Sequence, residues 1–415
     1  MRMAEILGQI FSRIDHSRDE VIALQKELTS RVALGPDNGG SGEHEKTAFV
    51  KKLLETLDPS EIHEINAPDP RAAFGYRPNL VAIWQGQQDL PKLWILSHSD
   101  IVPPGDLSLW SHNPYEIWVE GDKIYGRGVE DNQHGIVSSL LAVKAILETG
   151  HKPLRSFAIA IVADEETGSK YGLSYILHNN RTLFDSRDLI VVPDGGNETG
   201  TMIEVAEKSI LWILFTVLGK QCHASTPHKG NNSLTATAKL IVALEKLREE
   251  FSEEDKLFSP SITTIEPTKI EANVENVNTI PGKGDFYLDC RILPMYQVDT
   301  LLQRAREIAD EIAKDLGVKI HVEPAYREDA APPTPADSPV VRALADAIRT
   351  VTGRQATPMG IGGGTVAAFF RKAGLPAAVW CTCPDTAHQP NEYCIIPDIL
   401  TDAKVFAAMA MEPQG

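Results

Sequence analysis

The sequence predicts an α/β domain with a mostly parallel sheet, interrupted by a smaller α+β domain. Three observations lead to this prediction. The chain has 415 residues, which is long for one domain and suits two. Its first and last parts alternate short apolar segments with helical ones. Its middle part follows another order, in which two strand-like segments stand between two helical ones.

The apolar segments of the outer parts are short, continuous and rich in β-branched residues, which is typical of strands covered on both faces. A helix is expected between them at 135–148, where apolar residues recur on one face and Gly150 gives a stop signal. Further helical patterns cover 5–33 and 43–57. The predicted strands are 79–84, 93–96, 157–163, 189–192 and 377–381.

The middle part begins at about Lys208 and predicts the order β-α-β-β-α-β, which is that of a ferredoxin-like unit. A proline-rich linker at 331–336 follows it. We therefore expect a catalytic domain in two parts, 1–207 and 327–415, around an inserted lid and dimerisation domain at 208–326. The expected elements of the insert are strand 211–217, helix 235–249, strands 261–272 and 284–291, helix 298–316 and strand 319–322.

Composition and charge exclude several classes of partner. The formal net charge of −17 argues against nucleic acid and anionic membranes. No apolar run approaches the length of a membrane span, and the N-terminus lacks a signal-peptide core. The cysteines are odd in number, and Cys381 and Cys383 lack the second pair of a thiolate metal site, so free thiols are favoured. We expect a cytoplasmic protein.

Histidine and carboxylate residues gather where the predicted strands end. Ligands at the carboxyl ends of parallel strands meet at one edge of a sheet. Imidazole together with carboxylate is a ligand set for divalent cations, and zinc in particular accepts both. The candidates are His98 and Asp100 after one strand, Asp131 before the helix at 135–148, Glu165 and Glu166 after a second strand, Asp194 after a third, and His388 after the last.

This inventory matches what a two-metal hydrolase requires. Two divalent ions roughly 3.5–4 Å apart need a bridging carboxylate, terminal ligands on each side, and a water between them. A carboxylate that binds no metal can take the proton of that water. Adjacent side chains of an extended backbone point to opposite sides, so one of Glu165 and Glu166 can bind metal while the other addresses the water.

The order and spacing of these motifs, from Ser97-His-Ser-Asp100 to Thr386-Ala-His388, resemble the M20 family of metallopeptidases. That family includes glutamate carboxypeptidase, succinyl-diaminopimelate desuccinylase, acetylornithine deacetylase, tripeptidase and carnosine-type dipeptidases. The resemblance extends from about residue 20 to 405. It implies that His98, Asp131 and Asp194 serve one metal and Glu166 and His388 the other, with Asp131 bridging, Asp100 orienting His98, and Glu165 as general base.

The resemblance also assigns residues of the insert. His223 matches the family histidine that reaches the neighbouring subunit's site to stabilise the oxyanion, and its alternative is a surface histidine. Asn278 and Arg291 match positions that bind a substrate carboxylate, with a turn residue and a salt-bridge partner as alternatives. Gly363 and Gly364 lie in a run that resembles the family's substrate loop, although a plain tight turn has the same composition.

We therefore expect two divalent ions, with Zn²⁺ favoured over Co²⁺ and Mn²⁺, in an amidohydrolase that forms a homodimer through 208–326. Asp194 favours peptides as substrates, because the tripeptidase and carnosine-type branches have Asp there and other branches have Glu. The family's usual lysine two residues after the bridging aspartate is Gln133 here, and its glycine before the first histidine is Ser97. The alternatives are an N-acyl-amino-acid deacylase and a non-catalytic metal- or peptide-binding protein, which would have no need of Glu165.

Overall fold

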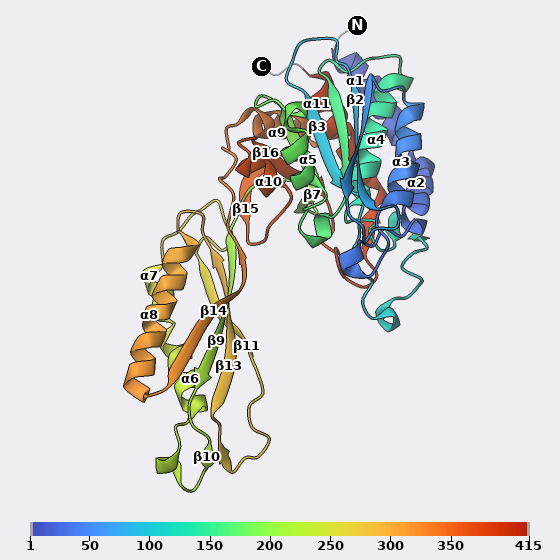
Figure 1. Ribbon diagram of the computed structural model, residues 1–415. Helices are drawn as coiled ribbons and strands as arrows, with labels where there is room; N and C mark the ends of the chain where they lie inside the picture. Colours follow the sequence, from blue (N-terminus) through green and yellow to red (C-terminus); the bar gives the residue numbers. More distant parts are fainter. Residues whose placement is uncertain (1–2, 413–415) are drawn as a thin grey trace. The chain divides into compact units, whose positions relative to one another are not determined.

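The computed structural model describes residues 3–412, which form two compact units (Figure 1). Unit 1 consists of 3–205, 334–358 and 369–412, and unit 2 of 206–333 and 359–368. Two segments that were expected in the catalytic domain, 327–333 and 359–368, belong to unit 2. The segment 359–368 groups with unit 2 because its backbone is bonded there: Lys208 donates to the Ile361 carbonyl at 3.0 Å, and Gly360 donates to that of Leu257 at 2.7 Å.

An eight-stranded mixed sheet carries the α/β part of the fold, in the order β1-β2-β6-β3-β7-β16-β8-β15. The four central strands β6, β3, β7 and β16 run parallel to one another, whereas β1, β2 and β8 pair antiparallel with their neighbours. The parallel pairing brings four carboxyl ends to one edge. The strands are β1 (Glu61–Pro68), β2 (Tyr76–Trp84), β3 (Leu93–His98), β6 (Phe157–Val162), β7 (Leu189–Asn197), β8 (Met202–Glu207), β15 (Thr357–Ile361) and β16 (Ala377–Thr382).

The α/β class is confirmed, and the helices predicted at 43–57 and 135–148 lie close to their predicted places. The single helical pattern at 5–33 is two helices, which are separated at His16 and Ser17. Helix α4 is buried on nearly its whole surface because it contacts the sheet on one side and α1, α2 and α11 on the other. The helices of this part are α1 (Met3–Asp15), α2 (Arg18–Ser30), α3 (His44–Thr56), α4 (Gln133–Glu148), α5 (Leu173–Asn179), α9 (Pro339–Thr352), α10 (Ala367–Lys372) and α11 (Ile396–Met411).

A small three-stranded sheet of unit 1 joins two distant parts of the chain. It contains β4 (Trp118–Glu120), β5 (Lys123–Tyr125) and β17 (Tyr393–Ile395), in the order β17-β5-β4. Tyr125 of β5 lies opposite Tyr393 of β17. Strand β5 leads into the turn before Asp131, and β17 follows the loop with His388, so the small sheet holds these two segments side by side.

Unit 2 contains a four-stranded antiparallel sheet in the order β11-β13-β9-β14, and its main elements follow one another as β-α-β-β-α-β. A short two-stranded sheet, β10 (Cys222–His223) with β12 (Thr279–Ile280), stands apart from it. The main elements are β9 (Ser209–Leu218), α6 (Ser233–Ala243), α7 (Lys246–Glu250), β11 (Thr264–Ile270), β13 (Lys283–Ile292), α8 (Val298–Leu316) and β14 (Lys319–Glu328).

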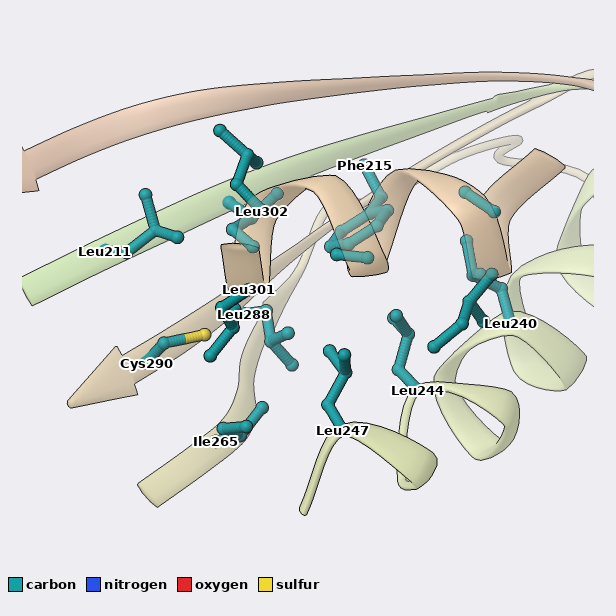
Figure 2. Close-up of a cluster of buried hydrophobic side chains, with 14 of the residues drawn as sticks. Leu211, Phe215, Leu240, Leu244, Leu247, Ile265, Leu288, Cys290, Leu301 and Leu302 are labelled. Carbon is teal, nitrogen blue, oxygen red and sulfur yellow. The ribbon is translucent and has the colours of Figure 1, made fainter. Parts of the chain in front are cut away.

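The core of unit 2 lies between this sheet and its helices (Figure 2). Leu211 and Phe215 of β9 point into the cluster, while Trp212 between them is exposed, as strand alternation requires. The ring of Phe215 stacks on that of Phe286, with centroids 4.8 Å apart. Leucines of α6 and α8 cover the other side of the cluster. Among residues 3–412, no helix combines the length and apolarity needed to cross a membrane.

Phe215→Ala is expected to cost about 3–5 kcal/mol of unfolding free energy, because it removes a fully buried ring and leaves a cavity. Chemical denaturation measures the loss, and hydrogen exchange of peptides from 209–328 locates it. Asp310→Ala, on the exposed side of α8, is the control and should change stability by less than about 0.5 kcal/mol. Equal stability of the two variants would contradict this account of the core.

Candidate metal centre

The sheet edge brings together residues from five segments of unit 1. His98 closes β3, Asp194 lies within β7, and a short 3-10 turn at Glu165–Thr167 follows β6. Asp131 precedes α4, and His388 lies in the loop between β16 and β17. Because β6, β3 and β7 are neighbouring parallel strands, their carboxyl ends present these side chains at the same place.

Asp131 stands between two imidazoles. Its Oδ1 lies 2.7 Å from His98 Nε2, and its Oδ2 lies 3.0 Å from His388 Nε2. Asp194 Oδ1 is 3.4 Å from His98 Nε2, and Glu166 Oε2 is 3.1 Å from His388 Nε2. Two groups result, His98/Asp131/Asp194 and Asp131/Glu166/His388, and in each the potential ligand atoms lie within 4.8 Å of one another. Asp131 is common to both groups.

Asp100 holds both His98 and the short turn Glu165–Thr167, the glutamate turn. His98 Nδ1 lies 3.0 Å from the backbone carbonyl of Asp100, which only accepts, so a neutral ring carries its hydrogen on Nδ1 and turns the Nε2 lone pair to the cluster. The carboxylate of Asp100 accepts hydrogen bonds of 3.1 Å from the backbone N–H groups of Glu165 and Glu166. Asp100 was expected to orient His98 through its carboxylate, whereas the closer contact is made by its carbonyl.

The carboxylates of the cluster are poorly compensated. In the described part of the chain, the ion pairs of Asp131, Glu166 and Asp194 go only to His98 and His388. Loss of hydration, followed by the charge of Asp131, raises the pKa of Glu166 to about 7. Hydrogen bonds to Asp131 and Glu166 raise the pKa of His388 to about 10. The site therefore favours added positive charge.

Glu165 stands in neither group. Burial, followed by the charge of Asp194, raises the pKa of its carboxyl well above the usual range. Glu166, by contrast, belongs to a ligand group, and its Oε1 is buried and has no hydrogen-bond partner among residues 3–412. A buried carboxylate oxygen without a donor is costly, and a divalent cation removes that cost. The nitrogen and oxygen donors present fit Zn²⁺, Co²⁺ or Mn²⁺.

Several supporting residues were missed by sequence reasoning. Asn132 donates from Nδ2 to Asp194 Oδ1 at 2.8 Å and so orients that carboxylate. Asp164, which has a left-handed φ of 64°, accepts from the backbone N–H of Tyr171 at 2.9 Å and lies 3.3 Å from the buried guanidinium of Arg77. These bonds hold the turn that carries Glu165. A lone arginine in β2 gives no sequence signal, whereas Asp164 stands directly before the paired glutamates.

The candidates of unit 2 lie in two places. His223 and Asn278 are neighbours, because β10 pairs with β12 and Ala224 donates to the Asn278 carbonyl at 2.8 Å. His223 Nδ1 accepts from the backbone N–H of Ser225 at 3.1 Å. A backbone N–H can only donate, so the neutral ring carries its hydrogen on Nε2, which is left as an exposed donor.

Arg291 lies beside the glycine run of unit 2. Its Nε donates to Asp289 at 2.8 Å and its Nη1 to the Gly362 carbonyl at 2.9 Å, so it is a salt-bridge partner and a loop contact at once. A Cβ at Gly363 would meet open space, whereas one at Gly364 would lie 2.8 Å from Glu328 Oε1. The Glu328 carboxylate is the end of a flexible side chain, so a larger residue at 364 requires only that this side chain move.

Comparison with known proteins places these observations in a family. The model of peptidase family M20/M25/M40 matches residues 94–412. Uncharacterized metallohydrolases of Methanococcus maripaludis and Methanocaldococcus jannaschii are each 41% identical, over 94% of this chain and 98% of theirs. A succinyl-diaminopimelate desuccinylase of Gluconobacter oxydans is 28% identical, over 89% of this chain and 91% of its own.

Solved structures share the fold. Human carnosine dipeptidase 1 has a TM-score of 0.73 at 17% identity, with 98% of each chain covered. An M20 family metallo-carboxypeptidase from Sulfolobus solfataricus has a TM-score of 0.68 at 19% identity, covering 94% of this chain and 98% of its own. The family match begins within β3 and contains all five clustered ligand candidates. The resemblance predicted from the motifs is confirmed: the chain belongs to peptidase family M20/M25/M40 and is a metal-dependent hydrolase.

Proposed function

We propose that this protein is a two-zinc amidohydrolase that cleaves the peptide bond of short peptides, as a dipeptidase or carboxypeptidase does. The observation that carries the proposal is the geometry of Asp131, whose two oxygens face two imidazoles 2.7 and 3.0 Å away, beside a glutamate that joins neither group. A shared carboxylate and a separate general base are what two-metal hydrolysis requires.

The residues divide the work as follows. His98, Asp131 and Asp194 would hold one ion, and Asp131, Glu166 and His388 the other. Ions held by these residues would supply Lewis acidity, both to polarise the scissile carbonyl and to lower the pKa of the attacking water. Co²⁺ and Mn²⁺ accept the same donors as Zn²⁺ and remain alternatives in the test below.

Glu165 takes and returns the proton. Its backbone N–H is bonded to Asp100, so the side chain is carried on a fixed turn. Burial favours its protonated form, and positive charge at the neighbouring groups counteracts that effect. The carboxylate can then accept a proton from the attacking water and pass it to the leaving amine.

Unit 2 supplies the groups that recognise the substrate. His223 offers an Nε2–H that suits an oxyanion, and we propose that it acts in the site of a second subunit. Arg291, oriented by Asp289, together with Asn278 and the loop of Gly363 and Gly364, suits a substrate carboxylate. A homodimer through unit 2 is supported by apolar side chains exposed on one face of α6, Leu234 at 46% and Val242 at 65%.

The alternative function is N-acyl-amino-acid deacylation, which the 28% identical desuccinylase supports. Mass spectrometry of a mixed panel separates the two: dipeptides, tripeptides, and N-acetyl and N-succinyl amino acids are offered to zinc-loaded and to chelated protein. Metal-dependent cleavage of peptides supports the proposal, and cleavage of acyl amino acids alone selects the deacylase. We place the reaction in a reducing cytoplasm, because all five cysteines are free thiols.

Glu165→Ala is expected to lower kcat by about 10²–10⁴-fold, because the proton acceptor is removed while both ligand groups stay intact. Steady-state kinetics and metal analysis of the same sample measure the two properties. Glu120→Ala, on the exposed end of β4, is the control and should keep full activity. Unchanged turnover in Glu165→Ala would exclude it as the base.

Chelation is expected to lower the Tm, because the carboxylates around Asp131 then lose their compensating charge. A site held at 100 times its Kd contributes about 2.7 kcal/mol. Differential scanning fluorimetry with EDTA, followed by back-titration with Zn²⁺, measures the change. Asp131→Asn, which weakens both groups, should show little response to EDTA. An EDTA-insensitive Tm in metal-loaded unmodified protein would contradict this prediction.

Mixed dimers test the role of His223 across subunits. Neither His223→Ala nor Glu165→Ala is expected to be active alone. Co-expressed with separate tags and purified as heterodimers, they should regain up to about half of the activity per dimer, since one site then has both groups. Heterodimers without activity, verified by native mass spectrometry, would show that His223 does not act in the partner's site.

A further inference from the structure

Two segments that are far apart in the sequence must be held together for the two ligand groups to share Asp131. The first is the aspartate turn, residues 126–131, which ends in Asp131 before α4. The second is the histidine loop, residues 385–392, which carries His388 into β17. Besides the pairing of β5 with β17, side chains of unit 1 join these two segments.

Glu392 reaches from the histidine loop into the aspartate turn. It is fully buried, and its carboxylate accepts from the backbone N–H groups of Gly128, Glu130 and Asp131 at 3.0, 3.0 and 3.2 Å. The guanidinium of Arg127 donates to the same carboxylate at 2.5 Å. Four donors of one short turn therefore point at a single side chain, which fixes the backbone from which Asp131 projects.

Glu130 reaches in the opposite direction. Its carboxylate accepts from the backbone N–H of Thr386 at 2.9 Å and from the hydroxyl of the same residue. The Thr386 hydroxyl also lies 3.1 Å from the backbone nitrogen of Tyr393, which donates to it. Glu130 is nearly buried, so these bonds are shielded from water. Each segment thus gives a carboxylate to the backbone of the other.

We propose that Glu392 and Glu130 form a reciprocal clamp that sets the distance between Asp131 and His388. The clamp thereby sets the affinity for the ion that His388 would bind together with Asp131 and Glu166. Both are positioning residues, because neither belongs to a ligand group. The inference rests on the proposed two-ion centre. Residues that orient metal ligands typically change affinity by about 10–100-fold when replaced.

A matched control distinguishes the clamp from ordinary buried polar structure. Asp188 is also buried, and it accepts from the indole N–H of Trp94 at 2.8 Å and from the backbone N–H groups of Lys92 and Asp185 at 3.1 and 3.0 Å. It lies at the opposite edge of the sheet, where β3 and β7 begin. Asp188→Asn therefore disturbs a similar set of bonds away from the ligands.

The first measurement is a Zn²⁺ titration of metal-free protein by competition with a chelating dye. Glu392→Gln and Glu130→Gln each place an amide N–H group opposite a donor that now has a carboxylate oxygen as its acceptor. Each variant should therefore bind at least one of the two ions about 10–100-fold more weakly. Unmodified protein and Asp188→Asn should each bind two ions, and the affinities measured for the variant should equal those of the unmodified protein. If Glu392→Gln does not fold, it is replaced by Thr386→Val. This substitution removes the hydroxyl that donates to the Glu130 carboxylate and keeps the backbone N–H of residue 386.

The second measurement is hydrogen exchange of the metal-free variants, and it does not depend on activity. In Glu392→Gln the amide of Thr386 should exchange faster although its own partner is unchanged, and in Glu130→Gln the amides of Gly128 and Asp131 should do so. Unmodified protein that binds fewer than two ions contradicts the proposed function, and exchange alone then decides on the clamp. The clamp is overturned if Glu392→Gln and Glu130→Gln bind Zn²⁺ as tightly as Asp188→Asn does. It is also overturned if a substitution in one segment leaves amide exchange in the other segment unchanged.

Discussion

The structure depends on one electrostatic constraint, the gathering of carboxylates at a single buried edge of the sheet. Asp131, Glu165, Glu166 and Asp194 converge there with two imidazoles as their nearest cationic partners. Burial, followed by the negative charge of Asp131, raises the pKa of Glu166. Such an arrangement is stable when positive charge is bound among the carboxylates. The chain belongs to a family of metallohydrolases, so divalent metal ions are the expected source of that charge.

Backbone architecture explains how these groups are held in place. The parallel strands β3, β6 and β7 bring His98, the glutamate turn and Asp194 to one edge, and further carboxylates then fix the segments that follow. Asp100 bonds the glutamate turn, and Glu392 bonds the turn before Asp131. In both cases a buried side chain accepts from backbone N–H groups, so the position of a ligand follows from the position of the main chain.

Much of this arrangement was predictable from the sequence. Strands such as β6 are continuous apolar runs, and the ligand candidates stand where those runs end, so both could be found without a structure. The three-residue strands β5 and β17 carry no such pattern, because they are too short to show one. Glu392 looks like any acidic residue of a polar loop, and only folding shows that four donors surround it. The return of 359–368 to unit 2 depends on backbone bonds that composition does not encode.

The most direct test of the central claim is anomalous diffraction at the zinc absorption edge, from crystals grown with Zn²⁺. Two peaks about 3.5–4 Å apart are expected, one bound by His98 and Asp194, the other by Glu166 and His388, with an oxygen of Asp131 on each. A single peak, or peaks away from Asp131, would contradict the two-ion centre from which the proposed chemistry follows.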